Sequence, residues 1–352
     1  MSSIAGTHVR PRDAAAVAEV LRARLGRVRL HGSGSRQQRL EPVPGALALD
    51  LTGLATIDRL DAPDQTCSVD CGVTRAQLDD ALRPHRLELP CPGDGTLGGL
   101  FASDPIGAAA PGGQSPRSLL LGMDALLADG TPFKSGARVV KSVAGFDVHK
   151  LLVGSEGRLF VATRLHLRLK PLPRARVAFA NQALDREAAL RLLQQLRELP
   201  HGLQSLQLLR VAGGGGGWNV RGAIAGRANF VAATLRALSL QESDAHPVLH
   251  LEAPAGGEVL AGLALPSALP RLLAGLPTDA PFLWHGGGRF ETTLPVANAT
   301  DRALAALASA GGHARIVAAA IGRRGLGTPI DAGHRSIADR LKHALDPHDV
   351  LC

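Results

Sequence analysis

The segment 159–169 constrains the fold most, because apolar and polar residues alternate along it. One set of alternating positions carries Leu159, Val161, Thr163, Leu165, Leu167 and Leu169. Three basic residues, Arg164, His166 and Arg168, lie between them. A period of two residues indicates a β-strand with one buried face. Pro171 and Pro173 follow, and because proline has no backbone N–H, we expect the strand to end there and a domain boundary near residue 173.

Strands and helices alternate before this segment. Residues 10–26 carry an apolar stripe of helical spacing (Val17, Val20, Leu21 and Leu25) and end in Gly26, a common helix C-cap. Short strands are predicted at 28–30, within 46–54 and within 65–73, and Thr74 can begin a helix as its N-cap.

Two further elements follow before residue 159. The pair Asp129-Gly130 lies between two apolar runs within 119–136, which is a strong signal for a β-hairpin. Asp147 can cap a short helix that ends at the glycines of "LLVGSEG".

The second half of the chain has a different pattern of predicted helices, strands and glycine-rich turns. Residues 186–199 have the pattern of a helix, and 205–212 and 247–253 alternate like strands. Gly213–Gly217 and Gly286–Gly288 mark turns, the first at a hairpin tip, and a last helix is predicted within 334–345.

The charge of the chain is +8, carried largely by scattered arginines, and only 3% of its residues are aromatic, with no tyrosine. Stacking platforms for bases are therefore scarce, which disfavours nucleic acid as a partner. The basic residues fit a solvated surface, an acidic protein partner or lipid headgroups. A signal peptide and an apolar run long enough to span a membrane are both missing, so we expect a cytoplasmic location.

The four cysteines, Cys67, Cys71, Cys91 and Cys352, include no C-x-x-C pair. Cys67 and Cys71 lie four residues apart on a predicted strand, too far along it to form a disulfide. We expect four reduced thiols and neither a metal nor an iron–sulfur site.

A glycine-rich loop, "LHGSGSRQQRL" at 30–40, follows the predicted strand at 28–30. Small residues after a strand allow successive backbone N–H groups to point into one concavity that suits phosphate oxygens. The same residues are common in ordinary surface turns, so both interpretations stay open for this loop alone.

Three segments in order, "LHGSGS", "PGDGTLGGLFAS" and "KSVAGFDVHKLLVGSEGRLFVAT", resemble the FAD-binding domain of the vanillyl-alcohol oxidase and p-cresol methylhydroxylase (PCMH) superfamily. Within it, "SPRSLLLG" and "LKHALDPHDVL" are most similar to the FAD-binding subunits of bacterial glycolate oxidases. The resemblance implies an α+β fold: a PCMH-type FAD-binding domain of two α+β subdomains (1–173), then an α+β cap domain with an antiparallel sheet (174–334). Residues 335–352 are expected to form a helix that returns to the first domain.

The resemblance also implies a set of cofactor-binding residues, each of which could otherwise belong to an ordinary turn. The first loop would bind the FAD pyrophosphate, and the second would pass beside the pyrophosphate and flavin. The third, with the following strand, would line the adenine and ribitol side. The residues are His31, Gly32, Ser33, Gly34 and Ser35; Pro92, Gly93, Thr96, Leu97, Gly98, Gly99, Ala102, Ser103 and Gly107; and Gly154, Ser155, Gly157 and Val161.

Non-covalent FAD is expected, because relatives that bond FAD to histidine in the first loop carry it just after the glycines. Here that place is Gly34, and His31 precedes the glycines. His31 either contacts a phosphate or has no role. Three departures from the family put tight binding in question: Phe160 in place of a glycine, the longer "SDPIGAAAPGGQ" segment, and a chain end directly after "DPHDVL".

Oxidation of a 2-hydroxy acid needs a cation for the carboxylate, a base or metal-bound alkoxide, and a hydride acceptor. Arg117 and Lys141 are the candidate cations near the flavin, with exposed loop charges as the alternative. The histidine-rich metal motif of related dehydrogenases is missing. "LWHGGGRFETTL" offers only His285 and Glu291, so no metal is expected.

The leading hypothesis is the FAD-binding subunit of a glycolate oxidase-type complex that oxidises glycolate or a similar small 2-hydroxy acid. A sister flavoprotein subunit would hold the substrate site, and an iron–sulfur subunit would receive the electrons, since the cysteines here lack cluster spacing. The complex would be cytoplasmic, with association at the inner face of the membrane left open. A self-sufficient flavin-dependent 2-hydroxy-acid dehydrogenase and a structural subunit that has lost FAD are the alternatives.

Overall fold

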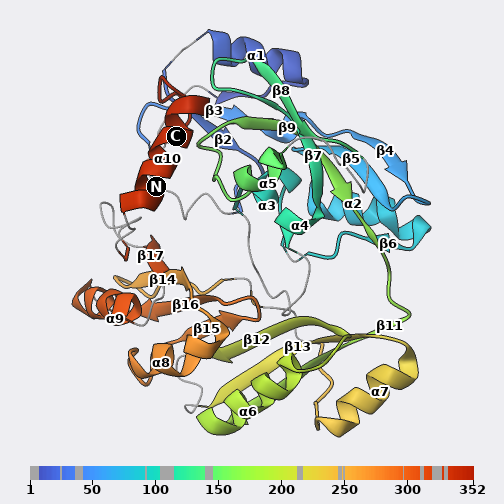
Figure 1. The fold of residues 1–352 in the computed structure, drawn as a ribbon, viewed down its shortest axis with the longest axis vertical. Helices are drawn as coiled ribbons and strands as arrows, with labels where there is room; N and C mark the ends of the chain where they lie inside the picture. Colours follow the sequence, from blue (N-terminus) through green and yellow to red (C-terminus); the bar gives the residue numbers. More distant parts are fainter. Residues whose placement is uncertain are drawn as a thin grey trace.

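The computed structural model describes residues 8–23, 26–35, 43–91, 93–103, 115–138, 146–211, 217–244, 248, 250–295, 297–309, 313–318, 327–328 and 332–352. Two bodies lie one above the other, joined by the chain that leads into strand β11 and by the return of the carboxyl terminus (Figure 1). The upper body is formed by the first half of the chain. The lower one contains residues 175–318.

A small parallel sheet begins the first body, in the order β1 (His8–Val9), β3 (Leu47–Asp50), β2 (Val28–His31). Helix α1 (Ala14–Arg22) begins at Asp13, whose carboxylate accepts a hydrogen bond from Ala16 N at 2.8 Å. It buries Val17, Ala18 and Leu21 against this sheet. The helix ends at Arg22 with Ala23 as its C-cap, before the predicted Gly26, so the helix prediction was too long at its carboxyl end.

The larger sheet of the first body is antiparallel, and the predicted alternating segment lies at its centre. Within the described chain, its order is β4 (Ile57–Asp61), β5 (Thr66–Asp70), β9 (Val161–Arg168), β7 (Leu120–Leu126), β8 (Pro132–Gly136). The Asp129-Gly130 hairpin, between β7 and β8, is confirmed. Strand β4 was not predicted. The chain also continues past residue 169 into a two-residue strand, β10 (Lys170–Pro171), which pairs with β6 (Leu87–Glu88).

Four helices pack on one side of this sheet: α2 (Arg75–Leu82), α3 (Leu97–Ser103), α4 (Pro116–Leu119) and α5 (Val148–Leu152). Helix α2 begins as predicted at Thr74, which forms a capping box with Gln77. The single turns η2 (Leu51–Gly53) and η3 (Arg83–His85) complete this body. The buried side chains Leu97, Leu100 and Leu119 join the helices to the sheet core.

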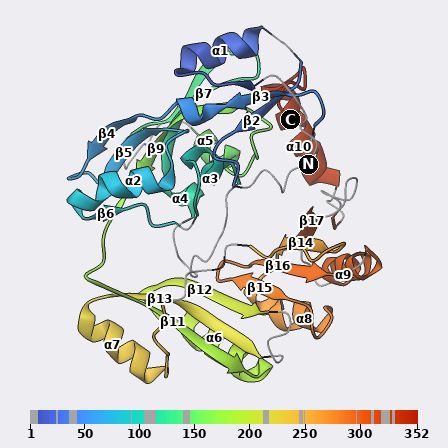
Figure 2. The same ribbon diagram turned by 180° about the vertical axis from the view of Figure 1, so that it is seen from behind.

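The second body is an antiparallel sheet with helices on its far side. Its described strands follow the order β11 (Ala175–Leu184), β13 (Trp218–Gly226), β12 (Leu203–Arg210), β15 (Phe282–His285), β16 (Arg289–Leu294), β14 (Glu258–Leu263), β17 (His313–Ala318). The helices are α6 (Arg186–Arg197), α7 (Ala228–Ala237), α8 (Leu269–Ala274, after the turn η4, Pro266–Ala268) and α9 (Ala297–Ser309). Figures 1 and 2 show α6, α8 and α9 on the side away from the first body, so the other sheet face looks toward it.

The predicted strand at 247–253 is wrong. Val248 and residues 250–253 join no strand; side chains hold this segment instead. Val248 N donates to Gln207 Oε1 at 3.1 Å, and Leu251 N donates to Glu291 Oε2 at 2.8 Å. The alternation therefore reflects a segment anchored to the sheet surface by polar side chains. The Gly286–Gly288 turn between β15 and β16 is as predicted, and residues 213–216 of the predicted turn at Gly213–Gly217 lie outside the described residues.

Helix α10 (Ala332–Leu345) carries the end of the chain back to the first body, beside β2 and β3 (Figure 1). Val28 N donates to Val350 O at 2.7 Å, and Cys352 N donates to Val28 O at 3.0 Å. The last residues thus pair with β2, the strand that leads into the first glycine-rich loop. None of the described helices is both long and apolar enough to cross a bilayer.

The buried carboxylate of Asp346 anchors this return. It accepts hydrogen bonds from Val350 N at 2.9 Å, Leu351 N at 2.8 Å and Lys342 Nζ at 2.6 Å.

Asp346→Asn places an amide donor against backbone donors, so we expect a loss of about 3 kcal/mol in the free energy of unfolding. Chemical denaturation measures it. Asp349→Asn is the control: Asp349 is exposed, and we expect less than about 1 kcal/mol. Equal losses in the two variants would contradict the anchoring role.

Candidate functional site

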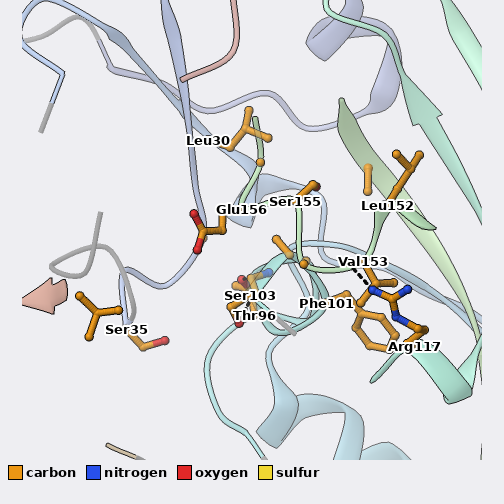
Figure 3. Close-up of a pocket in the computed structure, with 18 of the residues that line it drawn as sticks. Leu30, Ser35, Thr96, Phe101, Ser103, Arg117, Leu152, Val153, Ser155 and Glu156 are labelled. Carbon is orange, nitrogen blue, oxygen red and sulfur yellow. Dashed lines mark hydrogen bonds between the residues drawn. The ribbon is translucent and has the colours of Figure 1, made fainter. Parts of the chain in front are cut away.

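A cavity of about 1040 Å³ lies between the first body and the exposed face of the second sheet. Its upper wall is built from all three glycine-rich segments singled out in the sequence, and its lower wall from strands β14, β16 and β17. Figure 3 shows the upper wall, where Leu30, Thr96 and Ser155 come together from three segments far apart in the chain. The topology therefore brings the three predicted loops to one place.

The first and second loops touch through glycine. A Cβ atom on Gly32 would overlap Thr96 Oγ1, so only glycine permits the two loops to approach this closely. The second loop is held from behind, because Leu97 N donates to Val73 O and Gly98 N donates to Cys71 O, both at 2.8 Å. A Cβ on Gly98 would meet Cys71 Cβ at 2.9 Å.

The third loop is bonded to the end of helix α3. Gly154 N donates to Phe101 O at 3.1 Å, and Glu156 N donates to Ala102 O at 2.9 Å. Gly154 and Gly157 have φ of +87° and +76°, the left-handed region that favours glycine. The loop can therefore turn back over α3 while its backbone stays close to the other two loops.

The structure places most of the predicted cofactor residues on the cavity. Those that line it are His31, Gly32, Ser33, Gly34, Ser35, Thr96, Gly98, Gly99, Ala102, Ser103, Gly154, Ser155 and Gly157. Leu97 and Val161 are instead fully buried in the two cores of the first body, and Gly93 is outside the lining. Pro92, Gly107 and Lys141 lie outside the described residues.

Arg117, predicted to lie near a flavin, does line the cavity, and it also holds the third loop. Its Nη2 donates to Val153 O at 3.2 Å, the dashed line in Figure 3. The guanidinium thus fixes the backbone directly before Gly154. Phe160 lies nearby, packed edge-on against Phe133 with ring centroids 6.0 Å apart.

An apolar end of the cavity was missed by the sequence analysis. Leu120, Met123, Leu152 and Leu165 line it, together with His149, whose side chain is 1% exposed. Burial lowers the pKa of His149, so the ring is neutral near pH 7. Its Nδ1 is 3.1 Å from Ser135 Oγ, while Nε2 has no hydrogen bond to any described residue. An unsatisfied buried polar atom on an apolar cavity suits a ligand that is largely apolar and carries polar edges.

The charge of the lining is predominantly positive. Among described residues, Arg117, Arg289, Arg315 and Arg335 line the cavity with Glu156 as the one carboxylate. Glu156 of the third loop pairs with Arg315 of β17, an ion pair that joins the two bodies across the cavity wall. No group of three or more metal-ligating side chains gathers in the part of the chain that the structure describes. The site therefore suits an anionic ligand that contains an apolar ring system.

Comparison with known proteins agrees with this geometry. Residues 7–136 match the family described as the FAD binding domain. This part of the chain is similar to the FAD-binding domains of FAD-dependent oxidoreductases. It has the PCMH-type α+β fold, as predicted, and its cofactor is FAD.

Three relatives show how far the similarity extends. The chain is 27% identical to the Escherichia coli glycolate oxidase subunit GlcE over 342 residues, which is 92% of this chain and 90% of the relative. It is 38% identical to a D-lactate dehydrogenase of Archaeoglobus fulgidus over 115 residues, or 32% of this chain and 26% of the relative. The match to the Bacillus subtilis glycolate oxidase subunit GlcD is 29% over 136 residues, 38% of this chain and 29% of that protein. Against the last two, the chain therefore matches little more than a quarter of the relative's length.

The cavity fits FAD on three observations. Gly32 and Gly98 pack directly against Thr96 and Cys71 and line the cavity with backbone, which suits a pyrophosphate. Most of the charged side chains that line the cavity are arginines, which suits an anionic ligand. The apolar end, with the unsatisfied His149 Nε2, suits a flat ring system. We expect Gly32, Ser33, Gly34 and Ser35 to bind the pyrophosphate, with Thr96 and Ser103 beside it.

Replacing Gly32 tests the junction of the loops. We expect Gly32→Ala to weaken FAD binding by at least about tenfold, because the new methyl group overlaps Thr96 and separates the first two loops. Fluorescence titration of the apoprotein with FAD measures the dissociation constant. The matched background is Thr96→Ala, in which the same Gly32→Ala change should cost less, since Oγ1 is gone. An equal loss in both backgrounds would contradict the steric explanation.

The buried cysteines lead to a second prediction. Burial raises the pKa of Cys67 to about 12, and burial together with Asp70 raises the pKa of Cys71 further. Both stay protonated, so we expect iodoacetamide at pH 8 to leave them unmodified in the folded protein, whereas the half-buried Cys352 reacts slowly. Mass spectrometry of the peptides, with a denatured sample as control, measures this. Alkylation of Cys71 in the folded protein would show that the second loop opens.

Proposed function

We propose that the chain is the FAD-binding subunit of a glycolate oxidase-type complex that oxidises glycolate or a similar small 2-hydroxy acid. The observation that carries this is the cavity, where three glycine-rich loops and an arginine-rich wall meet. The similarity to a glycolate oxidase subunit over nearly the whole of both chains supports it.

FAD, when bound, supplies the hydride acceptor for the alcohol carbon. The residues of this chain orient it: the glycine-rich loops bind the pyrophosphate by backbone N–H groups, and Arg117 fixes the third loop through Val153 O. The ion pair between Glu156 and Arg315 holds the sheet formed by the seven described strands of the second body, here called the cap sheet, over the cavity. This keeps bulk water from the reacting groups.

Partners are part of this proposal. Cys67, Cys71 and Cys91 are buried in the core of the first body, and no group of three or more metal-ligating side chains gathers among the described residues, so the electrons need an acceptor outside this chain. We assign this role to an iron–sulfur subunit, with a sister flavoprotein subunit in the same complex. FAD is bound non-covalently. The complex works in the cytoplasm at the inner face of the membrane, where the net charge of +8 suits lipid headgroups or acidic partners.

The first test is the absorption spectrum of the purified protein before and after acid precipitation. We expect flavin bands that move to the supernatant, because no covalent bond retains the cofactor. Glycolate and an artificial electron acceptor are then added to the chain alone and to the complex isolated with it. Turnover that is much faster in the complex than in the chain alone supports the proposal.

Other outcomes of this test would overturn the proposal. Turnover by the isolated chain as fast as by any complex, with no copurifying partner, indicates a self-sufficient dehydrogenase. A protein that stays colourless when FAD is added indicates a structural subunit.

A further inference from the structure

The cap sheet turns one set of alternating residues toward the cavity. In β16, the alternate residues Phe290, Thr292 and Leu294 are buried and share one face of the sheet, and Phe290 and Leu294 pack in the core beneath the helices. Arg289 and Glu291 therefore lie on the opposite face. The register continues this face across the neighbouring strands, because Leu263 pairs with Arg289, and Ala261 pairs with both Glu291 and Arg315. Arg289, Ala261, Leu263 and Arg315 all line the cavity.

A separate segment lies across this face and carries a histidine. Gln207 of β12 binds both backbone polar groups of Val248: Nε2 donates to Val248 O at 2.6 Å, and Oε1 accepts from Val248 N at 3.1 Å. Glu291 binds the same segment three residues later by accepting from Leu251 N at 2.8 Å. Both anchoring side chains are buried, and His250 lies in the segment between the two anchored residues.

Glu291 joins His250 to Arg289. His250 Nδ1 lies 2.9 Å from Glu291 Oε1, and Arg289 Nη2 donates to the same oxygen at 3.3 Å. The carboxylate is fully buried, whereas both His250 and Arg289 line the cavity. A carboxylate accepts its hydrogen bond from Nδ1–H, and in that tautomer of neutral histidine Nε2 is the proton acceptor. A buried acid behind a histidine at a cavity wall is an arrangement that orients a general base.

We propose that His250, Glu291 and Arg289 form a site for a small 2-hydroxy carboxylate on the cap of this chain. Arg289 binds the carboxylate, His250 Nε2 accepts the hydroxyl proton, and Glu291 is a positioning residue that orients both. The oxidation is balanced by FAD, the cofactor of the proposed function, on which this inference rests. The O–H proton goes to His250, the hydride of the alcohol carbon goes to FAD, and the carbon–oxygen bond becomes a carbonyl. The chain thus has a substrate site of its own, besides any in a sister subunit.

Oxalate is the probe, because it has the size and carboxylate of a 2-hydroxy acid and no hydride to lose. Calorimetric titration of the flavin-loaded protein should show binding. Arg289→Gln should weaken it by at least about tenfold, the effect of one lost charged hydrogen-bond pair, and Arg289→Lys by less. Arg271→Gln, an exposed arginine on α8 at the far side of the sheet, is the matched control and should bind oxalate like the unaltered protein.

Turnover measurements distinguish the roles of His250 and Glu291 from the carboxylate-binding role of Arg289. His250→Gln and Glu291→Gln should lower kcat with glycolate by about 100-fold or more, while oxalate affinity stays within about threefold. A role in stability alone would lower both together, and the FAD content of each variant shows whether it is folded. If Arg289→Gln fails to fold, Arg289→Lys provides the test.

The outcomes distinguish this inference from the proposed function. A protein that holds FAD and acts in a complex but does not bind oxalate overturns the cap site alone. Oxalate binding that is unchanged in both Arg289 variants overturns it as well. A protein that holds no FAD overturns the proposed function first, since the hydride then has no acceptor.

Discussion

Close approach of three backbone segments around helix α3 is the constraint on which the rest of this structure depends. Gly32 lies against Thr96, Gly98 lies against Cys71, and the third loop hydrogen-bonds to Phe101 and Ala102 at the end of the helix. The contacts of Gly32 and Gly98 leave no room for a Cβ atom at either glycine. The upper wall of the cavity is therefore backbone, with N–H groups and small hydroxyls available to a ligand, and the specific side chains come from elsewhere.

Those side chains come from two other sources. The first body supplies an apolar end with His149, and Arg117 stabilises the third loop from behind. The cap supplies charge: arginines on β16 and β17, with Glu291 buried beneath one of them. Arg289 and Glu291 contact none of the three loops in any hydrogen bond described above, whereas Arg315 is tied to the third loop through Glu156.

Local signals in the sequence were sufficient for much of the first body. The alternation at 159–169 predicted the central strand, Thr74 predicted a helix start, and Asp129-Gly130 predicted a hairpin; each depends on residues within a few positions of one another. The failures involve contacts between distant segments. The alternation at 247–253 resembled a strand, yet it reflects anchoring by Gln207 and Glu291, about 40 residues away on either side. For the same reason Glu291 was interpreted with its neighbour His285, whereas its partner is His250.

The pairing of the last residues with β2 also has a consequence for how the protein is made. Val28 hydrogen-bonds to residues 350 and 352, so one edge of the strand before the first glycine-rich loop is completed by residues that lie beyond the whole second body in the sequence. Synthesis proceeds from the amino terminus, and this edge therefore stays unpaired until residues 350–352 have left the ribosome. The first body is completed only after the second body has been synthesised.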